Sequence, residues 1–182
     1  MQINEEIVTK FMAGDIDSFQ KIYEITKKSI YGVIYRMIGN YDDAMDIMHD
    51  VYVRVYEKRA LYHQEKAMLY TWIYKIAINS TLNMLKKKKN WDSDHAIEEI
   101  GALDFLDSID ESDTIALVLE VLENINPNYK ACLVLRDIED KTYEEIGDIL
   151  NLTPGTVRSR IFRGRAELKA LFFQYEERRV MV

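Results

Sequence analysis

The chain has 182 residues, of which 48% are hydrophobic, and this content excludes an intrinsically disordered protein. Its formal net charge is −7, and the small numbers of glycines and prolines, seven and two, favour a nearly all-helical fold. Apolar runs are short and interrupted by charges, so we expect no transmembrane span, and the single cysteine is typical of a protein of the reducing cytoplasm.

Four helices are predicted within residues 1–90 from the spacing of their apolar residues. Gly14 is expected to end the first helix. Asp15 is expected to cap the second helix, which Gly39 ends. A third helix is expected to begin near Asp42. The first of these helices covers about 3–12, and the fourth runs from about 67 to 88.

The fourth helix carries aromatic rings beside amides and lysines. At helical spacing, the residues that can face a core are Leu69, Trp72, Ile73, Ile76 and Ala77. The residues then expected to remain partly exposed are Tyr70, Tyr74, Lys75, Asn79 and Asn83. An exposed surface of this kind can stack unpaired bases, at about 1–3 kcal/mol per base. The alternative is a helix whose rings only pack within a helical bundle.

Residues 91–112 are predicted to be a linker. They contain eight acidic residues and no lysine or arginine, whereas residues 1–90 hold 14 basic and 11 acidic side chains. Such an uneven distribution of charge points to separate interaction segments, so the net negative charge does not exclude nucleic-acid binding. A stretch of 22 residues can reach roughly 70 Å, which allows two domains to contact separate sites.

Residues 113–182 are predicted to form a second helical bundle. Asn126 and Pro127 are a cap and a first helical residue, and Thr142 and Glu145 have the spacing of a capping box. The predicted helices cover about 114–123, 127–138, 142–150 and 154–173, and the last is capped by Thr153 with Pro154 at its first position.

The last two of these helices, separated by a short turn, have the form of a helix-turn-helix. In the second of them an apolar stripe for the core consists of Val157, Ile161, Gly164, Leu168 and Leu171. The opposite side carries Thr156, Ser159, Arg160 and Arg163, with Arg158 and Arg165 on a flank. Arginine suits bidentate contacts to guanine and to phosphates, so this helix is expected to lie in the DNA major groove. The alternative is a solvated amphipathic helix.

Four segments, in the right order and around the acidic linker, resemble motifs of the extracytoplasmic-function (ECF) group of the sigma-70 family. Residues 43–52 contain Asp-Ala-x-Asp, and residues 72–79 read Trp-Ile-x-x-Ile-Ala-x-Asn. Residues 143–147 and 155–160 resemble the family's helix-turn-helix. Gly147 and Gly164 stand where alanine is common in the family. The resemblance implies an all-α fold of two helical domains, sigma2-like over 1–90 and sigma4-like over 113–182, joined by the acidic linker over 91–112.

The resemblance also implies a function, that of a sigma factor directing promoter recognition, −10 melting and transcription initiation by bacterial core RNA polymerase, and roles for named residues. Those implied to bind core polymerase are Asp43, Asp46, His49, Asp50 and Arg54. Those implied to contact the −10 element are Tyr62, His63, Lys66, Trp72, Tyr74, Lys75, Asn79 and Lys86, the last within a run of lysines at 86–89. Those implied to contact the −35 element are Thr156, Arg158, Ser159, Arg160 and Arg163.

The implied partners are the polymerase core with its β′ and β subunits, promoter DNA and an anti-sigma factor, with no membrane insertion by the chain itself. Catalysis has little support, because the three histidines and Cys132 lack the spacing of metal ligands and no Gly-rich phosphate loop occurs. We therefore expect no enzyme activity, cofactor or metal. The alternatives are a stand-alone helix-turn-helix regulator that binds duplex DNA by itself, and a protein that only interacts with other proteins.

Overall fold

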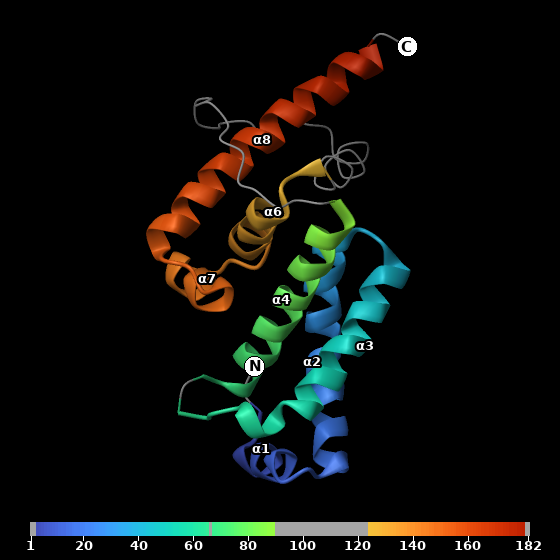
Figure 1. Ribbon diagram of the computed structural model, residues 1–182, viewed down its shortest axis with the longest axis vertical. Helices are drawn as coiled ribbons and strands as arrows, with labels where there is room; N and C mark the ends of the chain where they lie inside the picture. Colours follow the sequence, from blue (N-terminus) through green and yellow to red (C-terminus); the bar gives the residue numbers. More distant parts are fainter. Residues whose placement is uncertain (1–2, 66, 90–123, 181–182) are drawn as a thin grey trace. The chain divides into compact units, whose positions relative to one another are not determined.

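The computed structural model describes residues 3–65, 67–89 and 124–180, and all the regular elements in these ranges are helical (Figure 1). The predicted all-α class is therefore confirmed. The predicted linker over 91–112 and the predicted helix over 114–123 lie outside the described residues. The elements are α1 (Glu5–Met12), α2 (Ile16–Ile38), α3 (Tyr41–Glu57), the 3-10 turn η1 (Arg59–Leu61), α4 (Leu69–Lys89), α6 (Pro127–Leu133), the π-helical turn η2 (Val134–Ile138), α7 (Tyr143–Leu150) and α8 (Pro154–Val180).

The chain divides into two compact units, one over residues 1–84 and one over residues 85–182. Local capping signals set the helix ends of the first unit. The Asp15 carboxylate accepts a hydrogen bond from the backbone N–H of Ser18 at 2.8 Å, and Gly39 ends α2 in the left-handed conformation with φ of 77°. The third helix begins at Tyr41 because Asn40 is its cap, accepting from the backbone N–H of Asp43 at 3.0 Å.

The core of the first unit lies where α2 packs against α1 and α3 (Figure 1). Phe19 of α2 contacts three rings, those of Phe11, Tyr52 and Tyr56, at centroid distances of 6.0, 6.4 and 5.1 Å. A polar link crosses this apolar region between α2 and α3: the Tyr52 hydroxyl lies 2.7 Å from the Thr26 hydroxyl, which also donates to the Ile22 carbonyl oxygen at 2.7 Å. Because the Thr26 hydroxyl donates its one proton to Ile22, the Tyr52 hydroxyl is the donor to Thr26. Burial raises the pKa of Tyr52.

We expect unequal losses of stability when the two partners of this link are changed. Tyr52→Phe removes one donor and leaves the Thr26 hydroxyl bonded to Ile22, so it costs about 1 kcal/mol. Thr26→Val leaves the Tyr52 hydroxyl buried without an acceptor and costs about 1–3 kcal/mol. The double variant loses less than the sum, because the orphaned hydroxyl is then absent. Urea unfolding of the three variants measures this, and equal, additive losses would contradict it.

In the second unit α6 packs along α8 (Figure 1). The predicted helix over 127–138 is present as the α-helix α6, which continues directly into the wider π-helical turn η2. The Asn126 side chain accepts from the Asn128 backbone N–H at 2.9 Å, as the predicted cap. The Asn126 backbone N–H donates to the Glu167 carboxylate of α8 at 3.2 Å. Burial raises the pKa of Glu167, and the bond from Asn126 lowers it by less.

Cys132 is completely buried on α6. Burial raises the pKa of its thiol to about 12, so the thiolate population at neutral pH is smaller by on the order of 1,000-fold than for an ordinary thiol. We expect the native protein to react with an aromatic disulfide reagent at pH 8 at least about 100-fold more slowly than the protein in urea. Similar rates in both states would contradict this environment.

Candidate protein and nucleic-acid interfaces

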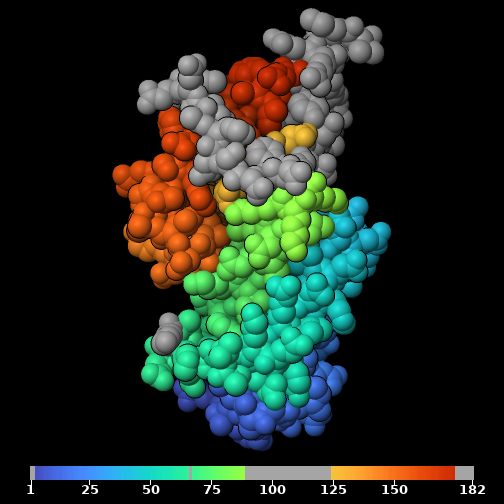
Figure 2. Space-filling view, viewed as in Figure 1, coloured from blue at the N-terminus to red at the C-terminus, as the bar shows by residue number. Residues whose placement is uncertain are grey.

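The predicted polymerase-binding residues lie along the outward side of α3. Asp46, His49, Asp50 and Arg54 are exposed, and Asp43 is half-buried. The opposite side of the same helix is in the core, where Ala44, Val51 and Val55 are fully buried. The helix surface is open in the space-filling view (Figure 2, cyan to teal). We call the outward set Asp43, Asp46, His49, Asp50 and Arg54 the α3 face.

An apolar residue that the sequence analysis missed lies within the α3 face. Val53 is 43% exposed and follows Asp46, His49 and Asp50 at the spacing i, i+3, i+4 and i+7, which puts all four on one stripe. Arg54 is held toward α4, since its guanidinium lies 3.5 Å from the Ser80 hydroxyl oxygen.

Of the two tyrosine rings expected to be partly exposed on α4, Tyr70 has the expected partial exposure and Tyr74 is buried, which corrects the expectation for Tyr74. Tyr74 is only 2% exposed, and Tyr70 is half-buried with its hydroxyl 2.6 Å from that of Ser29. Trp72, which was assigned to the core, is half-buried. The outward stripe of α4 is instead polar, and it consists of Thr71, Lys75, Asn79, Asn83 and Lys86 at intervals of three or four residues. The Asn79 amide donates to the Lys75 carbonyl oxygen at 2.9 Å.

In the segment before α4, the residues expected to contact the −10 element differ in how far they are exposed to solvent. His63 is exposed, whereas Tyr62 is only 4% exposed, and Lys66 lies outside the described residues. The Tyr62 ring lies 5.5 Å from the Trp72 ring, and its hydroxyl donates to the Ala67 carbonyl oxygen at 2.9 Å. Tyr62 therefore packs at the base of the segment. Leu61 and Met68, which the sequence analysis did not single out, are 66% and 65% exposed.

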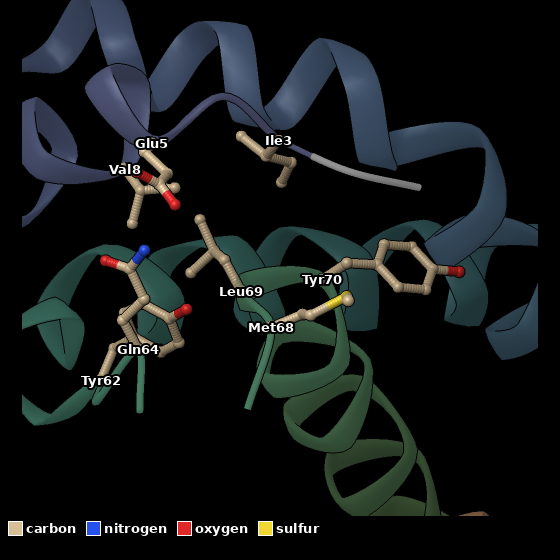
Figure 3. A pocket seen from close by; sticks show the side chains of 8 residues that line it. All are labelled: Ile3, Glu5, Val8, Tyr62, Gln64, Met68, Leu69 and Tyr70. Atoms are coloured by element: carbon tan, nitrogen blue, oxygen red, sulfur yellow. The ribbon is translucent and has the colours of Figure 1, made fainter. Parts of the chain in front are cut away.

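A cavity of about 200 Å³ lies between this segment and α1. Figure 3 shows Ile3, Glu5 and Val8 on one side, and Leu69 with Gln64 across from them. Tyr62, Met68 and Tyr70 complete the lining. The cavity has a mixed lining, in which aliphatic side chains stand beside two tyrosines, one carboxylate and one amide.

The predicted helix-turn-helix is present in the second unit. Its first helix, α7, has the full capping box: Thr142 accepts from the Glu145 backbone at 3.2 Å, and the Glu145 carboxylate accepts from the Thr142 backbone at 2.8 Å. Asn151 turns the chain in the left-handed conformation with φ of 57°. Thr153 then caps α8 by accepting from the Thr156 backbone at 3.2 Å. These local bonds fix the angle at which α8 leaves the turn.

Both glycines that stand in place of alanine lie at close approaches. A Cβ atom on Gly147 would be 2.7 Å from the Leu152 carbonyl oxygen in the turn. A Cβ atom on Gly164 would be 3.0 Å from the Tyr129 Cβ and 3.1 Å from Leu133 Cδ1. The glycines therefore allow the turn to close on α7 and α6 to pack tightly on α8.

The second helix turns its predicted DNA-contacting residues away from the core. Val157 and Ile161 are buried, Gly164 is buried against α6, and Leu168 and Leu171 are half-buried. Arg158, Ser159 and Arg163 are exposed, and Thr156 and Arg160 are half-buried. We call Thr156, Arg158, Ser159, Arg160 and Arg163 the α8 face.

The arginines of α8 differ in their partners. The Arg165 guanidinium forms an ion pair with the Asp137 carboxylate of η2 at 2.5 Å, and this contact raises the pKa of Arg165. The Arg158 guanidinium lies instead over the Tyr143 ring of α7, at 5.9 Å from the ring centroid. Among the described side chains of α8, Arg165 is the arginine that has a carboxylate partner. The arginines of the α8 face have none there, so their charges remain available to an anionic ligand.

The described residues contain no group of three or more histidine, cysteine or acidic side chains placed to hold a metal ion. In the same part of the chain, no helix is both long and apolar enough to cross a bilayer.

Two family models match the chain, each over one of the predicted domains. Sigma-70 region 2 matches residues 22–90, and Sigma-70, region 4 matches residues 115–168. Among curated proteins, the ECF RNA polymerase sigma factor SigW of Bacillus subtilis is 34% identical over 171 residues, covering 86% of this chain and 89% of SigW. The RNA polymerase sigma-H factor of Pseudomonas aeruginosa is 27% identical, covering 92% of this chain and 93% of that protein.

Two solved structures share the fold. One is the sigma factor RpoE in complex with the anti-sigma factor NepR from Bartonella quintana, with a TM-score of 0.60 and 18% identity, covering 84% of this chain and 95% of RpoE. The other is CnrH in complex with the cytosolic domain of CnrY, with a TM-score of 0.61 and 16% identity, covering 92% of this chain and 96% of the matched chain.

Proposed function

This chain belongs to the extracytoplasmic-function group of the sigma-70 family, and it is an RNA polymerase sigma factor that directs promoter recognition and transcription initiation; we propose how its surfaces divide this work. In this proposal residues 1–90 bind core polymerase and the −10 element, and residues 113–182 bind the −35 element. The acidic residues 91–112 join the two. The chemistry of RNA synthesis stays with the polymerase, so the chain itself is not an enzyme and acts in the cytoplasm, where the polymerase is.

The α3 face is proposed to bind the β′ subunit of the polymerase. The support is its stripe of exposed charges, with Asp46 and Asp50 one turn apart and Val53 between them and the end of the helix. Exposed carboxylates speed and orient association with a basic partner surface, and they allow the complex to dissociate again. A sigma factor that must be released after initiation needs a contact of this kind.

The −10 element is proposed to bind along the outward stripe of α4 and the segment before it. Lys75, Asn79 and Lys86 offer hydrogen-bond donors to phosphates and bases. His63, in the segment before α4, is also exposed. Trp72 is half-buried and offers the accessible ring. Because Tyr62 and Tyr74 are buried, we assign them the role of packing beneath this surface in place of direct contact with DNA.

The −35 element is proposed to bind the α8 face as duplex DNA. The observation that carries the assignment is that a fully capped helix-turn-helix exposes Arg158, Ser159 and Arg163 from its second helix while that helix buries an apolar stripe. Arginine, serine and threonine are the residue types that contact base edges and phosphates in the major groove.

Run-off transcription with core polymerase on a promoter library tests the function and the site assignments together. We expect transcripts only when the protein is added, and only from promoters that share a −10 and a −35 element. A gel shift with and without core polymerase separates a sigma factor from a stand-alone regulator. Tight, sequence-specific binding to duplex DNA without polymerase would count against the proposed division of labour.

We also propose that an anti-sigma factor covers the α3 face and the DNA-binding faces when the protein is inactive. The sigma factor RpoE, which shares the fold, was solved with an anti-sigma factor bound. A pull-down of the protein from its own cells is expected to recover this partner in addition to polymerase subunits. Recovery of polymerase subunits alone would remove this proposal.

A further inference from the structure

The two helices of the helix-turn-helix are joined by a contact between an aromatic ring and a cation. Tyr143 is the first residue of α7, and its ring is half-buried. Its place is fixed by the capping box of Thr142 and Glu145, which secures the start of α7. The Arg158 guanidinium of α8 lies over this ring, with its central carbon 5.9 Å from the centroid. A second cation, Arg136, lies 5.5 Å from the same centroid.

The neighbours of Tyr143 are themselves held in place. Arg136 donates from its guanidinium to the Lys141 carbonyl oxygen at 2.9 Å, so it is tied to the segment between η2 and α7. Arg165, two turns further along α8 than Arg158, is tied to Asp137 of η2. Of the two arginines on this flank of α8, Arg165 has a carboxylate partner and Arg158 has the Tyr143 ring, which it shares with Arg136.

This difference between a ring and a carboxylate decides what each arginine can still do. A carboxylate takes up the N–H donors of a guanidinium, as Asp137 does with Arg165. An aromatic ring attracts the cation through its face and accepts no conventional hydrogen bond, so the N–H donors of Arg158 stay available for base edges or phosphates. Tyr143 can therefore restrict the side chain of Arg158 without competing with DNA for it.

We infer that Tyr143 is a positioning residue that holds Arg158 in the conformation in which it meets the −35 element. The inference rests on the proposed role of the α8 face in binding that element. An exposed arginine loses rotamer freedom when it binds, and a ring that restricts it beforehand lowers this cost. A contact of this kind at an exposed site corresponds to about a two- to five-fold gain in affinity for the −35 element.

A double-mutant cycle tests the inference with the full chain bound to core polymerase. The four proteins are the unchanged chain, Tyr143→Leu, Arg158→Ala and the double variant, and the measurement is equilibrium binding to promoter DNA with an intact −35 element. We expect Tyr143→Leu to weaken binding about two- to five-fold when Arg158 is present and to have no effect when Arg158 is alanine. An equal loss in both backgrounds, or no loss in either, overturns the inference.

Two further variants keep the test decisive if Tyr143→Leu is poorly folded. Tyr143→Phe keeps the ring and is expected to bind the promoter as the unchanged chain does. Arg158→Lys keeps the charge but lacks the planar group that stacks on the ring, and is expected to bind more weakly and to be insensitive to the change at Tyr143. A loss of binding in Tyr143→Phe as large as in Arg158→Ala overturns the inference.

The base preference at the −35 element separates failure of this inference from failure of the proposed function. If Arg163→Ala changes the preference at one position while Arg158→Ala changes neither a base preference nor the overall affinity, Arg158 is not a contact, and the inference is overturned while the role of the α8 face stands. If no arginine variant of the α8 face changes a base preference or the overall affinity, the proposed role of that face fails, and the inference fails with it.

Discussion

The double variant Asp46→Lys with Asp50→Lys is expected to lose binding to core polymerase by about 100-fold or more, and to give no run-off transcript at concentrations where the unchanged chain saturates. The two carboxylates lie one turn apart on the exposed stripe of α3. Placing lysines opposite a basic partner surface costs several kcal/mol, because attraction is replaced by repulsion between like charges. Fluorescence anisotropy with labelled protein and purified core measures the affinity.

Two features of this result would identify the cause as charge at the interface. The loss is expected to shrink as the salt concentration rises, since salt screens exposed charges. A matched control, Asp17→Lys with Glu24→Lys, makes the same change in charge at exposed positions of α2 and is expected to bind core polymerase normally. Equal losses in the two double variants would show an effect of net charge alone and would remove the α3 face from the proposed interface.

Arg160→Ala and Arg163→Ala are each expected to lower the preference for one base pair of the −35 element by about 1–3 kcal/mol, which is the discrimination that a bidentate arginine contact to guanine provides. Transcription from promoters with single substitutions in this element measures the preference. A uniform loss on all promoters, with a smaller dependence on salt, would assign the arginine to a phosphate contact.

Arg165→Ala is the matched control for these variants. It lies on the same helix, but its guanidinium is paired with Asp137, so we expect its loss to leave the −35 preference unchanged. Because both partners are largely exposed, the loss of this ion pair should cost at most about 1 kcal/mol of stability. A change of base preference in Arg165→Ala would contradict the distinction between the paired arginine and the arginines of the α8 face.

The helix ends were predictable from the sequence because each is set by bonds between close neighbours in the chain. Asp15, Gly39, Asn126 and the pair of Thr142 with Glu145 all act as predicted. The start of α3 was placed one residue late, because Asn40 acts as the cap ahead of Asp42. The wider turn η2 had no local signal in the sequence.

The buried side of α4 could not be derived from spacing alone. Apolar and aromatic residues occupy more than half of the circumference of this helix, so two neighbouring stripes compete for the core. Tyr74 and Ile78, four residues apart, are buried with Ile73 and Ala77, and the polar residue Asn79 is left outside. Only the packing of α4 within the first unit decides between the stripes, and the predicted exposure of Tyr74 was wrong for this reason.

The α3 and α8 faces were easier to predict, because a narrow apolar stripe leaves one possible outward side. What spacing did not indicate are apolar residues on the outside, such as Val53, and contacts between different helices, such as that of Tyr143 with Arg158. Such contacts depend on how α7 and α8 are turned relative to each other, and this is set by Asn151 and the glycine at position 147.

The inaccessible thiol on α6 makes the chain suitable for spectroscopy with attached dyes. The chain's single cysteine is Cys132, which is buried, so a cysteine introduced at an exposed position would take up a fluorophore selectively without removal of the native one. Glu57 at the end of α3 and Gln174 near the end of α8 are both exposed and lie in different units. A donor and an acceptor at these two positions would report, by energy transfer, how far apart the two halves are held before and during promoter opening.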